Sequence, residues 1–329
     1  MGQNKSWFRK HKIGTAIFIF IILLVMIAIT NKKKGESPNI YPSESGKGIK
    51  TAEWDSVRAK DVPRVANEWK KPVRLEVSED GKWEDSLFVT LDGGRVYFIY
   101  YPGDLITDIQ KGKYKTNLKI YFSDKPFTTK VLDDRPYFNE KYWSPAGPSL
   151  TASGDMFYHS NKPIEGDKGR YLSHIYKNDQ LLPFNTADIS YGNPQYCSGK
   201  DELWFDNNDK VIYVLKNAEA DNFQGVPTLA PKPINSYDSA INDHQPWLSD
   251  DCKNIYFSST RNSMGSGPFI YTSERIAEDE WSEPRLVVKS NIGVGEATLT
   301  ADMKKLFFLQ VLRNPEGQFT SNLFYMEKK

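Results

Sequence analysis

The sequence has few cysteines and a low mean hydropathy, and each of these excludes a class of protein. Its 329 residues include 2 cysteines, which excludes a disulfide-rich scaffold and argues against a structural zinc site. The mean hydropathy of −0.58 excludes a polytopic membrane protein. The abundant aromatic residues, 8 Trp, 18 Tyr and 18 Phe, argue against long disorder. Most of the chain is therefore expected to be folded and soluble.

The formal net charge of +1 hides an uneven distribution. Residues 1–34 hold seven basic residues and no acidic one, so the rest of the chain carries −6. Residues 13–30 read IGTAIFIFIILLVMIAIT and contain no charge. At 1.5 Å per residue, a helix of this length spans about 27 Å, enough for the hydrocarbon core of a bilayer. The pattern predicts a basic segment over residues 1–12 and a transmembrane helix over residues 13–30.

A cleaved signal peptide is the alternative for this apolar run. The run is long for one, and the residues that follow it, NKKK, replace the small residues of a cleavage site. Basic residues flank both ends, so the positive-inside rule favours a cytoplasmic amino terminus only slightly. We expect a single-pass signal anchor, with the following domain in the periplasm or on the cell surface. Residues 31–62 are rich in Gly, Ser, Pro and Lys and are expected to be a flexible tether.

A repeat organises residues 63–329. Five segments share a small residue or proline, a turn rich in Asp and Gly, and an apolar-aromatic strand. The aromatic residues that close these strands are 60, 47, 52 and 51 positions apart, and they are Phe98, Tyr158, Phe205, Phe257 and Phe308. An Ile-Tyr or Phe-Tyr step follows each of them. Such strands, separated by Asp, Asn and Gly turns, are typical of antiparallel hairpins, and a period near 50 residues is typical of propeller blades.

The two ends of the repeat region indicate how the ring closes. The motif Glu-Trp-x-x-Pro occurs at residues 280–284 and again at residues 68–72, before the first repeat. The fifth repeat ends at Lys329 after three strands. A strand from residues 68–77 therefore supplies the missing fourth strand, which protects two sheet edges. The sequence predicts an all-β domain over residues 63–329, a five-bladed β-propeller closed by an N-terminal strand.

The same residues carry a resemblance to a known family. The segment SDDCKNIYFSSTR at residues 249–261, followed by FIYTS at residues 269–273, resembles the WD-like β-propeller repeat of the TolB type. The segment LDGGRVYF at residues 91–98 is the next best copy, although Cys252 and Met303 replace the usual turn glycine in other copies. The resemblance covers residues 63–329. It implies an extracytoplasmic binding or scaffold domain more often than a defined reaction.

Several chemical motifs are missing. The chain has no Gly-rich phosphate loop, no Gly-x-Ser-x-Gly elbow, no His-Glu-x-x-His and no Cys-x-x-Cys pair. This removes the common nucleotide-binding, serine-hydrolase and zinc-protease interpretations, so neither a cofactor nor a metal is expected. The acidic domain also opposes nucleic-acid binding, since the basic clusters are explained as flanks of the apolar run.

Polar residues at the starts of the innermost strands are the candidates for a site, because those starts surround one mouth of a propeller channel. Asp85, Asp243 and Glu296 are candidate catalytic carboxylates, because glycoside hydrolysis needs two such groups about 5 to 10 Å apart. Candidate ligand-binding residues are Glu84, Asn193, His244 and Arg261. In the alternative interpretation, the carboxylates bond to turns between repeats, His244 is merely packed, and Arg261 forms a salt bridge between repeats.

Cys197 and Cys252 belong to neighbouring repeats, but Cys197 aligns within a strand and Cys252 within the following turn. We therefore expect free thiols that fill small spaces, with a disulfide as the alternative.

The expected function is that of a membrane-anchored, extracytoplasmic propeller that binds a protein or a glycan. The connections over residues 100–119 and 216–242 are the expected recognition surface. The alternative is a carbohydrate-active hydrolase or lyase that uses the carboxylates at the channel mouth.

Overall fold

The computed structural model describes residues 62–111, 118–141, 143–167, 172–207, 210–263, 267–313 and 319–329. The expected membrane helix at residues 13–30 and nearly all of the expected tether lie outside these ranges. Within them, no helix has both the length and the apolar character needed to span a bilayer. The α-helix α4 (Leu105–Gln110) has six residues, and nearly all other regular structure in these ranges is β-strand.

Each predicted repeat forms a run of antiparallel strands. Within each run, the strands are neighbours in the sheet in the same order as in the sequence. The first contains β3 (Trp83–Val89), β4 (Arg95–Tyr101), β5 (Ile120–Asp124) and β6 (Val131–Leu132). The second contains β7 (Pro145–Leu150), β8 (Met156–Ser160), β9 (His174–Lys177) and β10 (Gln180–Leu181). The third contains β11 (Gly192–Cys197), β12 (Glu202–Asp206), β13 (Ile212–Lys216) and β14 (Thr228–Leu229).

The last two repeats take strands from the amino-terminal side of the domain. The fourth contains β15 (Asp243–Leu248), β16 (Asn254–Ser259), β17 (Phe269–Glu274) and β18 (Arg285–Lys289), with β1 (Arg64–Val65) added outside β18. The fifth contains β19 (Gly293–Leu299), β20 (Lys305–Arg313) and β21 (Phe319–Glu327), with β2 (Val73–Arg74) paired to β21.

The chain closes on itself through residues 68–77, which we call the closing segment. Within it, β2 runs antiparallel to β21, and Trp69 forms a further bridge to Lys328. The pairing expected for this segment is therefore confirmed. The addition of β1 to the fourth repeat was not expected. The fifth and first repeats also meet at one parallel pair, Ser321 with Trp83, and so form one eight-stranded sheet.

The aromatic pattern of the sequence fixes the pairing within each repeat. The aromatic residue that closes the second strand lies opposite the Tyr of the Ile-Tyr step in the third strand in four repeats. These pairs are Phe98 with Tyr121, Tyr158 with Tyr176, Phe205 with Tyr213, and Phe257 with Tyr271. In the fifth repeat Phe308 lies opposite Phe324. Such cross-strand aromatic pairs stabilise antiparallel sheets. Their residues are buried, except for Tyr121 and Tyr213, which are partly buried.

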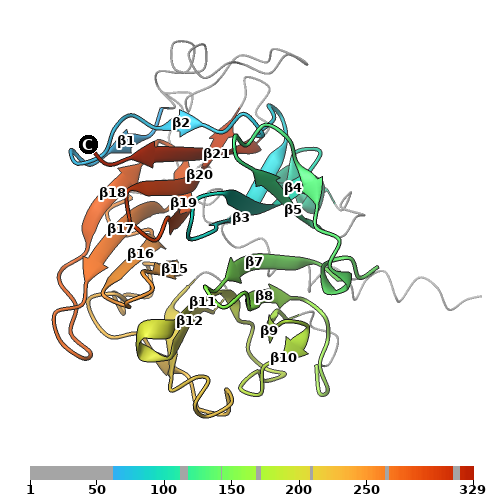
Figure 1. Cartoon of the computed structure of the whole chain (residues 1–329), viewed down its shortest axis with the longest axis vertical. Helices are drawn as coiled ribbons and strands as arrows, with labels where there is room; N and C mark the ends of the chain where they lie inside the picture. Colours follow the sequence, from blue (N-terminus) through green and yellow to red (C-terminus); the bar gives the residue numbers. More distant parts are fainter. Residues whose placement is uncertain are drawn as a thin grey trace, which may run out of the picture.

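The first strand of each repeat lies at the centre of the molecule. These first strands are β3, β7, β11, β15 and β19. Each contacts the first strand of the next repeat, and the contact between β19 and β3 completes the circle. The sheets fan outward from these strands, as Figure 1 shows. Antiparallel sheets arranged radially around a shared centre, with the first strand innermost, define a β-propeller.

Candidate functional site

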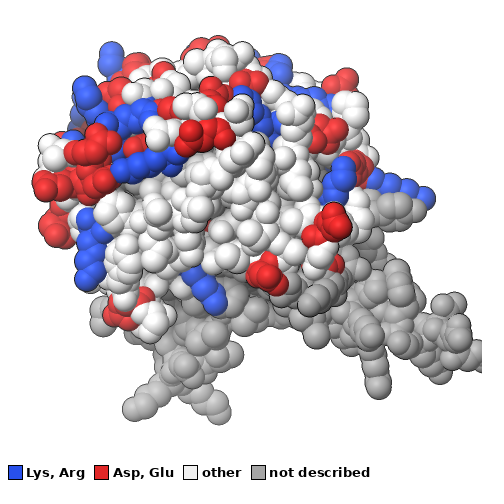
Figure 2. Space-filling model, turned by 90° about the horizontal axis from the view of Figure 1, so that it is seen from below, with Lys and Arg blue, Asp and Glu red and all other residues white. Residues whose placement is uncertain are grey.

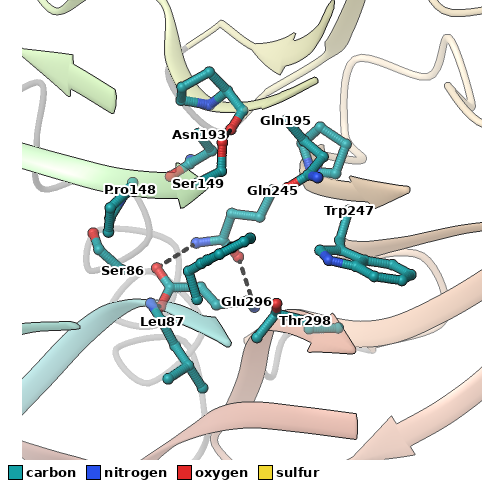
Figure 3. A pocket seen from close by; sticks show the side chains of 15 residues that line it. Ser86, Leu87, Pro148, Ser149, Asn193, Gln195, Gln245, Trp247, Glu296 and Thr298 are labelled. Atoms are coloured by element: carbon teal, nitrogen blue, oxygen red, sulfur yellow. Dashed lines mark hydrogen bonds between the residues drawn. The ribbon is translucent and has the colours of Figure 1, made fainter. Parts of the chain in front are cut away.

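The innermost strands surround a narrow central channel (Figure 3). Each of the five strands is interrupted by a register shift at the same place, and one residue in each shift has a positive φ. These residues and angles are Ser86 (57°), Gly147 (56°), Asn193 (51°), Gln245 (52°) and Glu296 (57°). All five line the channel. A β-bulge re-aims a side chain, and here it turns one residue of every repeat toward the channel.

This backbone conformation is unfavourable for residues other than glycine, so the surrounding structure must hold it. The surroundings of Gly147 show how closely the innermost strands pack. A Cβ atom at Gly147 would lie 2.8 Å from His159 Nδ1 and 3.1 Å from the Cα atom of Asn193. The second repeat therefore has no room for a side chain at the position where the other four repeats carry one.

Hydrogen bonds link the bulges of neighbouring repeats. The Asn193 backbone N–H donates to His159 Nδ1 of the second repeat at 3.1 Å, and Asn193 Nδ2 donates to Asp206 Oδ2 at 2.8 Å. The backbone N–H of Gln245 donates to the same carboxylate oxygen of Asp206 at 2.9 Å. One buried carboxylate thus joins the third repeat to the fourth.

Glu296 continues these links toward the first repeat. Gln245 Nε2 donates to Glu296 Oε1 at 3.2 Å, a bond visible in Figure 3. The other carboxylate oxygen, Oε2, accepts the Leu87 backbone N–H at 2.9 Å. In addition, Thr298 Oγ1 accepts the Val89 backbone N–H at 3.2 Å. Glu296 therefore bonds the fourth, fifth and first repeats together.

The space left in the channel is small. The cavity measures about 40 Å³, whereas pockets for small-molecule ligands occupy roughly 300 to 1,000 Å³. A single water needs about 10 to 15 Å³ on this scale, so the channel has space for a few waters and not for a sugar ring. The bulge side chains fill it and bond across it, so their arrangement stabilises the ring.

The three candidate catalytic carboxylates lie in different surroundings. Glu296 lines the channel, and Asp85 and Asp243 are not among its lining residues. Asp85 accepts the indole N–H of Trp83 at 3.0 Å and the backbone N–H of Ser86 at 2.9 Å. The described residues therefore place one of the three carboxylates in the channel, where hydrolysis of a glycosidic bond requires two.

Asp243 and Arg261 form a buried ion pair. Arg261 Nη2 lies 2.7 Å from Asp243 Oδ1, which also accepts the Ser259 hydroxyl at 2.6 Å. The guanidinium group of Arg261 donates further to the carbonyl oxygens of Pro233 and Ile234. Arg261 thus fastens the connection before β15 to its own repeat. Its partner is in the same sheet, and not in a neighbouring repeat as the alternative interpretation held.

The other two ligand candidates are fully buried. His244 lies in β15 opposite Ser258. Glu84 lies in β3, where its Oε1 accepts the Glu79 backbone N–H at 3.1 Å. Burial raises the pKa of Glu84 to about 8, although Arg74 and hydrogen bonds from Asn322 and Ser78 act in the opposite direction. Glu84 therefore belongs to the seam with the closing segment and not to the channel.

The expectation of free thiols is wrong, because Cys197 and Cys252 form a disulfide. The turn after β11 packs against the turn after β15, and the Gly199 N–H donates to the Asp250 carbonyl oxygen at 2.9 Å. This contact offsets the difference in alignment and brings the two Cα atoms to 5.7 Å, within the usual range for a disulfide. The bond connects the third repeat to the fourth.

Glu202 lies beside this disulfide, and the three groups come within 4.8 Å of one another. Cysteines and a carboxylate can ligate a metal, but here the carboxylate accepts two bonds from Arg275, at 3.0 and 2.5 Å, and one from Trp204 Nε1. With the thiols bonded and an arginine on the carboxylate, this group does not fit a cation.

The ring of five bulges around the channel, one from each innermost strand, is the feature that sequence reasoning missed. A signal for it was present, because proline follows the bulge residue in three repeats, at residues 148, 194 and 246. Proline has no N–H to donate to a strand ladder, so its recurrence inside an innermost strand marks an interruption of pairing.

No family model matches the chain, and no curated protein matches it. Among solved structures, a TolB protein from Agrobacterium tumefaciens is 12% identical, with 77% of this chain and 85% of that chain covered and a TM-score of 0.42. A thermostable family-43 glycoside hydrolase is 11% identical, covering 75% and 89%, with a TM-score of 0.46. A gluconolactonase from Xanthomonas campestris is 10% identical, covering 90% and 99%, with a TM-score of 0.44. At such values no activity is transferred, and the propeller assignment rests on the strand pairing.

Proposed function

We propose that the chain is a membrane-anchored, extracytoplasmic five-bladed propeller that binds a protein partner. Each predicted repeat has its own run of antiparallel strands, and each contributes one bulge to the channel. This supports a count of five blades, with the eight-stranded sheet as two blades joined at one pair. Residues 13–30 are the proposed anchor and residues 31–62 the proposed tether.

The disulfide supports the proposed location outside the cytoplasm. Structural disulfides persist in the periplasm and on cell surfaces, whereas cytosolic thiols are kept reduced. Cys197 and Cys252 are fully buried and are the two cysteines of the chain. A signal anchor that exports the domain would place them in an oxidising compartment.

The observation that carries the binding proposal is a set of three exposed apolar side chains in one connection of the third repeat, which we call the third-repeat patch. Val226, Leu229 and Tyr237 expose 84%, 41% and 49% of their surface, and all three belong to the connection over residues 216–242. Figure 2 views the molecule from the side where the second and third repeats lie, and uncharged residues cover most of the centre of that face. Charged residues gather mainly along its rim. Exposed apolar groups of this kind favour a protein partner.

The outer strands indicate how such a partner is bound. In the fourth and fifth repeats, β1 and β2 from the amino-terminal side cover strands β18 and β21. The first three repeats end instead at the two-residue strands β6, β10 and β14, and within the described ranges no further strand pairs outside them. Of these three, β14 lies in the connection that carries Val226, the most exposed apolar side chain of the described residues. An uncovered edge strand is a template for an extended segment of another chain. The proposed partner therefore contributes an extended, apolar segment at β14, as this chain does for two of its own repeats.

A hydrolase is not proposed, because the channel is too small for a sugar and holds one of the three candidate carboxylates. A glycan partner is also disfavoured, since Val226 and Leu229 offer no hydrogen bonds to sugar hydroxyl groups and the Tyr237 hydroxyl already donates to the Ala230 carbonyl oxygen.

The test is site-specific photocrosslinking in cells that produce the full-length chain. A photoreactive phenylalanine analogue at Val226 should give one discrete protein adduct, and Leu229→Lys in the same chain should abolish it. The matched control carries the analogue at Ile276, which is 66% exposed on the fourth repeat. The same adducts from both positions, or none from position 226, would exclude the third-repeat patch as the binding surface.

A further inference from the structure

A second cavity, of about 210 Å³, lies between the fifth and first repeats. We call it the seam cavity. It is bounded by β2 and the two residues after it, by the turn that follows β5, and by β20 and β21. It shares no described lining residue with the channel. A cavity of roughly 150 Å³ accommodates benzene, so the seam cavity has room for an aromatic ring with a short polar substituent.

One wall of the seam cavity is aromatic and fixed in place. The ring of Phe127 packs edge-on against Phe307 with 5.8 Å between centroids, and Phe307 stacks with Tyr325 at 5.7 Å. Phe127 is held at a φ of 65°, which a bulky residue rarely adopts, and its N–H donates to the Asp124 carbonyl oxygen. These rings provide a rigid apolar surface.

The seam cavity is also lined by four charged residues, Arg74, Glu76, Lys125 and Lys305. Arg74 and Lys305 each pair with an acidic residue outside the lining, at 3.2 and 3.3 Å. Lys125 and Glu76 line the cavity too, are exposed, and form no ion pair within the described ranges. The cavity therefore combines an aromatic wall with one ammonium and one carboxylate that no side chain of the described part of the chain neutralises.

We propose that the seam cavity binds a free α-amino acid with an aromatic or large apolar side chain. The side chain packs on Phe127, Phe307 and Tyr325. Lys125 donates to the α-carboxylate of the ligand, and the α-ammonium group of the ligand donates to Glu76. Both bonds are charge-assisted, and together they require a zwitterion. This small ligand at the seam is independent of the protein partner proposed for the third-repeat patch.

Binding at this place couples to closure of the ring. Glu76 belongs to the closing segment, whereas Lys125 belongs to the first repeat and Phe307 to the fifth. A ligand that bridges them binds the closed ring and not the opened one, so it raises the melting temperature in a concentration-dependent way.

The experiment is calorimetric titration of the purified full-length chain with three related compounds. L-Phenylalanine carries both charged groups, phenylacetate lacks the ammonium group, and phenethylamine lacks the carboxylate. L-Phenylalanine should bind at least about tenfold more tightly than either of the others, because each lost charged hydrogen bond costs about that factor.

Two exposed-site variants assign the contacts without disturbing the core. Glu76→Gln should weaken L-phenylalanine at least tenfold and leave phenylacetate unchanged. Lys125→Gln should weaken L-phenylalanine similarly and leave phenethylamine unchanged. Glu283→Gln and Lys253→Gln, also exposed, are the matched controls and should change nothing. Absence of binding overturns the proposal, and so does L-phenylalanine binding that depends on only one of the two residues or on neither.

Discussion

Glu84 lies in an environment that disfavours the ionised form of its carboxyl group. Its side chain is fully buried in β3, and burial raises its pKa to about 8 from an ordinary value of 4.5. Between these two pH values the folded protein keeps a proton that the unfolded chain releases. The contribution of Glu84 to stability is therefore largest below about pH 4.5 and is lost as the pH rises through about 8.

Replacing Glu84 with Gln should remove this dependence. Between pH 5.5 and 8.5 the wild-type free energy of unfolding should fall by about 3 kcal/mol more than that of Glu84→Gln, since each pKa unit corresponds to about 1.4 kcal/mol. Gln retains an oxygen for the bond from Asn322. Urea unfolding at both pH values measures the difference, with exposed Glu283→Gln as the control. Equal pH slopes in wild type and Glu84→Gln would show that Glu84 does not carry a raised pKa.

The candidate residues show what sequence can predict at the residue scale. Polar residues at the starts of innermost strands were expected around the channel, and Asn193 and Glu296 lie there. Asp85 and Glu84 do not, because side chains on a regular strand alternate between faces and the bulge after Asp85 changes that alternation. The sequence does not reveal which residue takes the positive φ, so the direction of each neighbouring side chain could not be derived.

At the scale of elements, the repeats were predictable because each strand pair contains its own register signal. Tyr121 lies opposite Phe98 and Tyr213 opposite Phe205, so the spacing of aromatic residues determines the pairing. The strand over Arg64–Val65 carries no such signal, because two residues show no periodicity. The disulfide was missed for a related reason, since the contact between two turns of different repeats is not encoded in either turn alone.

The closing segment holds the ends of the domain through buried side chains as well as through β2. Trp69 is 2% exposed and packs in the cluster that contains Phe308 and Phe324. Trp69→Ala should lower the free energy of unfolding by about 3 to 5 kcal/mol, because it removes a large buried side chain and leaves a cavity.

Chemical denaturation of the full-length chain tests this expectation. Ile276→Ala, at a highly exposed position, is the matched control and should change stability by less than about 0.5 kcal/mol. If Trp69→Ala unfolds at the same denaturant concentration as the control, the closing segment does not stabilise the propeller.

At the scale of the whole molecule, the seams between repeats are held by contacts of several kinds. The second and third repeats meet through His159 and Asn193, and the fourth, fifth and first through Glu296. The closing segment adds a strand at the fifth repeat. The seam between the third and fourth repeats has a covalent bond, the Cys197–Cys252 disulfide, in addition to the bonds on Asp206. Opening the ring at the seam between the third and fourth repeats therefore requires the loss of a covalent bond as well as of hydrogen bonds.

The disulfide should contribute measurably to the stability of the whole ring. It spans 55 residues, and constraining a loop of that size in the unfolded chain stabilises the folded state by about 2 to 4 kcal/mol. Cys197→Ala/Cys252→Ala should therefore melt at a lower temperature than the wild type. A strong reductant should lower the wild-type melting temperature to that of the double variant and leave the variant unchanged, because the variant has no bond to break. A wild-type melting temperature that equals that of the variant without reductant would mean that the third and fourth repeats are held by their hydrogen bonds and packing alone.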